Sequence, residues 1–89
     1  MFENIKDGDL ITLKLASGEE VVCTLESHGI DIVSIKNGLV LMQGPQGLAF
    51  GTFFSTAKQE APIKIARDKI TAAAHVNDKI EGEYKKVFS

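Results

Sequence analysis

The feature that most constrains this fold is a pair of alternating segments joined by a glycine turn. Apolar and polar side chains alternate over residues 10–15 and again over residues 21–25, and Ser17–Gly18 lies between them. Such alternation is typical of half-buried strands, and glycine reaches the positive φ that a tight turn needs. The sequence therefore predicts an antiparallel pair of strands that buries Ile11 and Cys23 on one face.

More strands are expected downstream. Residues 30–35 form a run rich in β-branched side chains. Asn37–Gly38 favours a two-residue hairpin turn, so residues 39–42 are expected to return antiparallel to that run. Pro45 in the segment Gly44–Gly47 indicates another turn. Residues 63–76 are expected to form a last pair of strands around a turn that contains Arg67.

A phenylalanine-rich segment follows the proline turn. Phe50, Phe53 and Phe54 fall within residues 48–54, and Gly51 between them indicates a bulge or a close backbone approach. Three clustered rings can stack on the bases of single-stranded nucleic acid. Because no Lys or Arg lies nearby, the core or an interface is the favoured interpretation.

The tail changes to a helical period. Asp78 and Glu81 have the spacing of a capping box, and Glu81 and Lys85 form an i to i+4 pair. Gly82 weakens such a helix by up to about 1 kcal/mol, so it must dock its apolar stripe on the same chain or on a neighbour. That stripe consists of Ile80, Tyr84, Val87 and Phe88.

The length, cysteine content and charge of the chain restrict the classes of protein to which it can belong. A single domain over residues 1–89 buries about 60 to 65% of the surface of its unfolded chain, so its core is thin. The lone Cys23 fits a reducing compartment, and residues 1–7 have no apolar stretch, so we expect a cytoplasmic protein without a membrane anchor. The net charge of −2 and a pI near 5.6 disfavour nonspecific binding to nucleic acid.

No constellation for catalysis or cofactors is found. Ser27, His28 and Asp31 have the residue types of a nucleophilic triad, but neighbours on a strand point to opposite faces. One cysteine and two distant histidines do not make a zinc site. No glycine-rich segment with phosphate-binding spacing precedes a helix. We therefore expect no enzymatic activity, no metal and no cofactor.

Two segments carry a resemblance to a known family. Residues 13–25 resemble the first Sm motif and residues 65–70 the second, so the chain is similar to Sm-like (LSm) proteins, most of all to the small ones of marine tailed phages. The resemblance implies an all-β, SH3-like, strongly bent five-stranded barrel over about residues 8–76. A short C-terminal helix over about residues 78–88 follows, and subunits join edge to edge in a homo-oligomeric ring.

The chain departs from the family at the base-binding pocket. Sm proteins have glycine where Cys23 stands, and after the second strand they carry an Asp, an aromatic or His, and an Asn. Two alignments with the family are possible, and they place its Asp at the position of Gly29 or of Asp31. Neither alignment retains the complete set of pocket residues. Arg67 is retained, but Asp68 follows it where the family has glycine.

The resemblance implies an RNA site made of His28, Asp31, Arg67 and Lys69. A loop guanidinium can stack on a base and hold a phosphate, although Arg67 can equally hold its turn by pairing with Asp68 or another carboxylate. For His28 the alternative is a solvated loop side chain. Two functions follow: a non-enzymatic ring that binds single-stranded RNA weakly, or a protein-interaction or scaffolding module that kept the ring and lost the pocket. The acidic pI favours the second.

Overall fold

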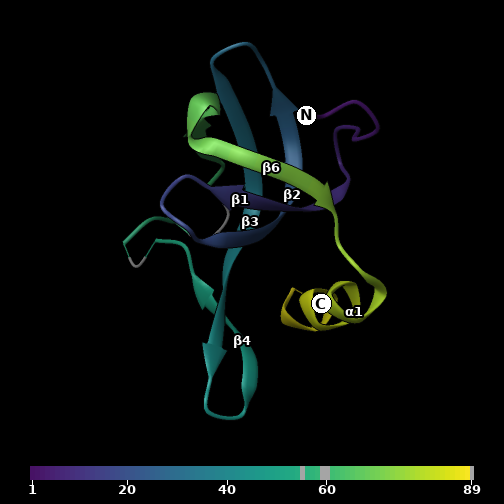
Figure 1. The fold of residues 1–89 in the computed structure, drawn as a ribbon, viewed down its shortest axis with the longest axis vertical. Helices are drawn as coiled ribbons and strands as arrows, with labels where there is room; N and C mark the ends of the chain where they lie inside the picture. The colour runs from purple at the N-terminus through teal and green to yellow at the C-terminus, as the bar shows by residue number, and fades with distance from the viewer. Residues whose placement is uncertain (55, 59–60, 89) are drawn as a thin grey trace.

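The computed structural model describes residues 1–54, 56–58 and 61–88 and consists of one antiparallel sheet followed by a short helix (Figure 1). The mostly β fold with one C-terminal helix confirms the expected class. The described part of the chain has six strands where five were expected. In chain order the elements are β1 (Leu10–Leu15), β2 (Glu20–His28), β3 (Ile32–Gly44), β4 (Gly47–Thr52), β5 (Ile63–Ala66), a 3-10 turn (Arg67–Lys69), β6 (Ile70–His75) and α1 (Asp78–Val87).

The strands follow the order β4-β3-β2-β1-β6, and β5 pairs with the first part of β3. The expectation that the last two strands pair with each other is wrong, because β5 lies on β3 and β6 on β1. The 3-10 turn between them redirects the chain from one side of the sheet to the other. Among the described residues no pairing joins β6 to β4 or β5, so the sheet is not closed.

The first hairpin is confirmed. β1 pairs with β2 so that Ile11 lies opposite Cys23 and Leu13 opposite Val21. Gly18 in the turn has φ of +106°, a conformation that residues with a Cβ rarely adopt. Local alternation and a local turn thus suffice to set this register.

The hairpin expected at Asn37–Gly38 is wrong, because these two residues lie inside β3. β2 pairs with both halves of β3, and the pairing shifts between Val22 opposite Leu39 and Thr24 opposite Lys36. Two residues of β3 therefore face one residue of β2, which is a β-bulge. Asn37 takes φ of +52° there. The positive φ expected at both residues is present at Asn37 and not at Gly38, and it serves a bulge instead of a turn.

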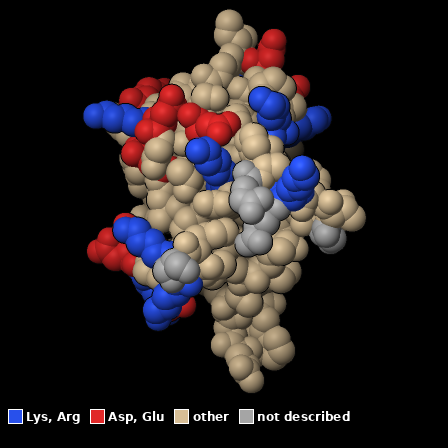
Figure 2. All heavy atoms as spheres, turned by 180° about the vertical axis from the view of Figure 1, so that it is seen from behind, with Lys and Arg blue, Asp and Glu red and all other residues tan. Residues whose placement is uncertain are grey.

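The turn expected at Gly44–Gly47 is confirmed and joins β3 to β4. The resulting β3–β4 arm (residues 39–52) projects beyond the body of the molecule (Figure 1). No Asp, Glu, Lys or Arg occurs between Lys36 and Lys58. The lower protrusion in Figure 2 is accordingly free of charged side chains. Neither the bulge nor the close backbone approach expected at Gly51 is present: the β3–β4 pairing is regular there, and a Cβ at Gly51 would lie 2.6 Å from Cε at the end of the flexible Met42 side chain.

The core lies on the inner face of the sheet. Its fully buried side chains include Ile11, Leu13, Val21, Cys23, Leu25, Val33 and Ile35. Burial raises the pKa of the Cys23 thiol to about 12, as expected for a small apolar residue rather than a nucleophile. Phe2 and Ile5 of the N-terminal segment pack against the same core.

Helix α1 packs on the outer face of the sheet. Tyr84 is buried there against Val22 and Leu39, so the apolar stripe docks on its own chain. The helix is capped one residue earlier than expected: Oδ1 of Asn77 accepts a hydrogen bond from the Ile80 amide at 2.8 Å, and the capping box of Asp78 and Glu81 is not formed. The expected pair of Glu81 and Lys85 is present at 2.8 Å, whereas Val87 is half exposed.

Within the described ranges, no helix has the length and apolar character needed to cross a lipid bilayer.

Candidate functional site

Arg67 begins the 3-10 turn that links β5 to β6. Its amide donates to the Asp31 carbonyl at 2.8 Å, and its Nη1 donates to the Gly29 carbonyl at 2.8 Å. The side chain thus ties its turn to the loop between β2 and β3. The alternative role of holding the turn has support, but the groups that accept these two hydrogen bonds are backbone carbonyls and not the Asp68 carboxylate.

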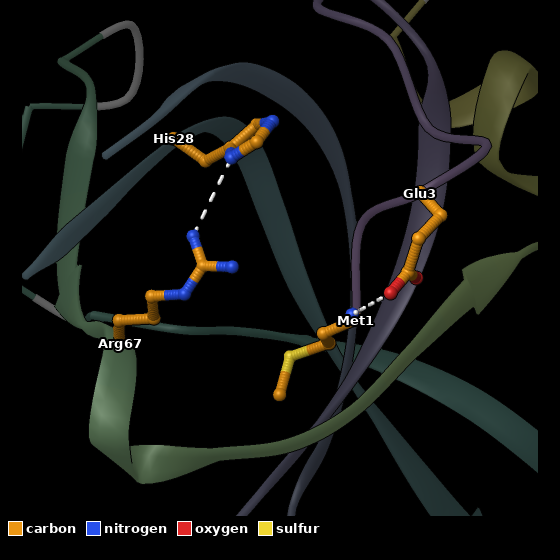
Figure 3. A network of polar contacts seen from close by, with 4 residues as sticks. All are labelled: Met1, Glu3, His28 and Arg67. Atoms are coloured by element: carbon orange, nitrogen blue, oxygen red, sulfur yellow. Dashed lines mark hydrogen bonds and ion pairs between the residues drawn. The ribbon is translucent and has the colours of Figure 1, made fainter. Parts of the chain in front are cut away.

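His28 is the last residue of β2 and not a loop residue. Its exposed ring brings Nδ1 to 3.4 Å from Nη1 of Arg67 (Figure 3). A guanidinium can only donate, so this contact requires Nδ1 without a proton. The fold therefore joins two of the expected site residues that lie 39 positions apart in the sequence.

Phe2 completes this cluster and was missed by sequence reasoning. Its ring stacks on the His28 ring with centroids 4.8 Å apart and planes at 18°, and Cζ of Arg67 lies 5.0 Å from the Phe2 centroid. Phe2 is only 5% exposed. The sequence contains only a weak indication that Phe2 is buried: Phe2 and Ile5 are apolar residues, three positions apart, in an otherwise polar N-terminal segment.

The other two expected site residues take part differently. Asp31 contributes its backbone carbonyl to the Arg67 amide, while its side chain is exposed. Lys69 is exposed, and its carbonyl accepts from the Ala16 amide at 2.7 Å, which ties the turn to the β1–β2 hairpin. No described contact joins Lys69 to His28 or Arg67. The observed cluster is thus Phe2, His28 and Arg67.

An acidic group lies beside the cluster. Glu3 forms an ion pair with the amino group of Met1 at 2.8 Å (Figure 3). This hydrogen bond is the main cause that lowers the pKa of the Glu3 carboxyl, and the charge of Arg67 adds a smaller contribution. The potential around Arg67 is therefore mixed rather than strongly positive.

The phenylalanine-rich segment is divided between three environments. Phe53 packs against the inner core, and Phe50 packs against the outer cluster under α1. Phe54 is 53% exposed and stacks on Phe53 with centroids 5.1 Å apart. Two of the three rings thus serve packing, which agrees with the favoured interpretation, and one is left at the surface.

Metal-binding side chains and the second histidine bear on the other sequence expectations. Across residues 1–54, 56–58 and 61–88, no group of three or more metal-binding side chains comes together. His75 is exposed at the end of β6, where its Nε2 lies 3.0 Å from Oδ2 of Asp9. What the cluster offers is a guanidinium and an imidazole, both flat and capable of stacking.

Comparison with known proteins adds no further constraint, since no protein-family model matches the chain and no curated protein is significantly similar to it.

Proposed function

We propose that this protein is a non-catalytic, Sm-like assembly module of the cytoplasm that associates with copies of itself in a ring. The observation that carries the proposal is the open sheet, whose two sides end in different unpaired strands. Among the described residues, β6 pairs only with β1, and β4 and β5 each pair only with β3. Unpaired strand edges carry free N–H and C=O groups that can pair with another chain.

Of these three strands, β4 and β6 lack the usual protection against such pairing, whereas β5 carries Lys64. Soluble proteins commonly place lysine, proline or inward charges on exposed edges. β4 has none of these, and β6 has Ala72, Ala73 and Ala74 with no Lys or Pro. Small side chains let a second backbone approach closely. A head-to-tail contact between two different edges closes into a ring when the rotation between subunits allows it.

Light scattering on a sizing column tests this proposal. We expect a single oligomer at tens of micromolar, and we expect Ala74→Lys on the edge strand β6 to shift it toward monomer. Gln46→Lys, in the exposed turn at the tip of the arm, is the matched control and should keep the oligomer. A wild-type monomer at this concentration would refute the ring.

Weak binding of single-stranded RNA is the second candidate function, and the contact between His28 and Arg67 favours it. Guanidinium and imidazole planes stack on unpaired bases, and the guanidinium also holds phosphate. The adjacent Glu3 and the net charge of −2 limit the affinity. Arg67→Ala is expected to weaken binding of a short U-rich or A-rich oligonucleotide in fluorescence anisotropy and to lower the salt slope by about one.

If the wild-type protein does not bind RNA at low salt, the module serves protein interaction instead. A hollow of about 610 Å³ between the uncharged β3–β4 arm and α1 supports this alternative. Its lining combines the apolar side chains of Leu48, Phe50 and Ile80 with charged ones, which are Glu20, Lys79 and Glu83. Apolar surface beside polar residues is typical of interaction sites.

A further inference from the structure

The N-terminal strap (residues 1–9) contacts the candidate RNA site, and its role there rests on the RNA-binding part of the proposed function. Phe2 lies on the flat groups of the candidate site, nearly parallel to the His28 ring and within cation–π distance of Arg67. Phe2 is 5% exposed, whereas His28 is exposed. One face of the His28 ring, together with the side of the Arg67 guanidinium that meets Phe2, is therefore occupied by a side chain of the same chain.

The phenyl ring of Phe2 makes stacking and cation–π contacts with His28 and Arg67 but no hydrogen bonds. It stacks, but it has no atom that can accept from or donate to His28 or Arg67. Both hydrogen bonds of the guanidinium to described residues use Nη1. A nucleobase is also flat, and the nucleotide adds acceptor atoms on the base edge and on the phosphate. The remaining N–H groups of Arg67 can donate hydrogen bonds to these atoms.

Near Phe2 the strap is held by side chains and not by backbone hydrogen bonds to the sheet. Its firm attachment is at Gly8 and Asp9, where the Gly8 amide donates to the Leu25 carbonyl at 2.7 Å and the Leu25 amide donates to the Asp9 carbonyl at 2.9 Å. None of the backbone hydrogen bonds described for residues 1–7 reaches beyond residue 9. The buried side chains of Phe2 and Ile5 hold the rest. Segments held in this way open locally at lower free energy than the whole domain.

We propose that Phe2 is a built-in competitor of the ligand: it covers the stacking face that His28 and Arg67 share, and this face takes a nucleobase of single-stranded RNA only when the strap moves away. The apparent affinity then equals the affinity of the open form multiplied by the fraction of molecules whose strap is open. Whatever holds Phe2 elsewhere, such as a neighbouring subunit or a bound protein, would activate the site.

The test measures the affinity for a fluorescent six-nucleotide U-rich RNA by anisotropy at low salt. With the strap closed in more than about nine molecules in ten, Phe2→Ala should tighten binding at least about tenfold. Adding Arg67→Ala to Phe2→Ala should abolish the gain. Val87→Ala is the matched control, because it shortens an exposed apolar side chain of α1 on the outer face of the sheet, and it should leave the affinity unchanged.

Phe2 also packs against the core, so a second variant is needed to separate the loss of stacking from a loss of stability. Phe2→Leu keeps apolar volume but cannot stack as a flat ring, and it should give a smaller gain with a melting temperature closer to that of the wild type. Equal affinity of the wild type, Phe2→Leu and Phe2→Ala would overturn the proposal and leave RNA binding intact. Absence of binding by folded wild type and both variants would overturn RNA binding and the proposal together.

Discussion

The hydroxyl of Tyr84 in α1 donates a hydrogen bond to the carbonyl of Asn37 at the bulge of β3, with 2.8 Å between the oxygens. The same hydroxyl lies 3.2 Å from Oγ1 of Thr24 on β2. Burial raises the pKa of this phenol, which stays protonated and able to donate at neutral pH. One side chain of the helix thus joins the bulge to the strand that faces it.

Removing this hydroxyl tests how much the contact stabilises the fold. Tyr84→Phe keeps the buried ring but leaves the Asn37 carbonyl without its donor, and we expect the free energy of unfolding to fall by about 1 to 3 kcal/mol. Urea denaturation measures the change. Lys85→Ala, an exposed neighbour on the helix, is the control and should change stability by less than about 0.5 kcal/mol. Equal midpoints for Tyr84→Phe and the wild type would show that the contact contributes nothing.

Truncation after Asn77 tests the docking of the whole helix. It uncovers Val22 and Leu39 on the outer face of the sheet, so we expect a lower melting temperature or aggregation. Val87→Ala should have little effect, because Val87 is 51% exposed. A truncated protein that melts at the wild-type temperature and keeps its oligomeric state would contradict docking on the same chain.

The backbone of Asn37 makes a prediction about substitution at the bulge. Its φ of +52° is open to glycine and costly for a β-branched residue. We therefore expect Asn37→Gly to be close to neutral and Asn37→Val to destabilise the protein by about 1 to 2 kcal/mol in thermal or urea unfolding. Lys36→Val, on the preceding strand residue with ordinary φ, separates the backbone effect from β-branching. If both valine variants were equally stable, the bulge would not constrain this residue.

The buried thiol of Cys23 predicts how stability depends on alkaline pH. Its pKa is raised from 9.0 to about 12, so the unfolded chain loses this proton at lower pH than the folded protein. The stabilisation is fully present below pH 9 and decreases as the pH rises toward 12, by about 4 kcal/mol in all. Urea unfolding at several pH values measures the slope, and Cys23→Ala should flatten it. A slope that survives in Cys23→Ala would assign it to other groups.

Thiol reagents give an independent test of the same burial. Cys23 has no exposed surface in the folded protein. We expect a disulfide reagent at pH 8 to react slowly with the native protein and fast in urea, since the thiolate is the reactive species. Fast reaction without denaturant would mean that the sheet opens readily around β2.

Sequence alone determined the features that depend on neighbouring residues. Alternation placed Ile11 and Cys23 on one buried face, glycine and proline placed the turns at residues 17–18 and 44–47, and a helical period placed α1. Each follows from backbone conformations that a few consecutive residues prefer, whatever surrounds them.

The tertiary structure decided which segments meet. Asn37–Gly38 favours positive φ in a turn and in a bulge alike, and only the pairing of β2 with both halves of β3 selects the bulge. The strands beside Arg67 find partners on opposite sides of the sheet, and Phe2 covers Arg67 and His28, residues far from it in sequence. Such contacts depend on the burial of surfaces that only the folded chain creates, so no local pattern contains them.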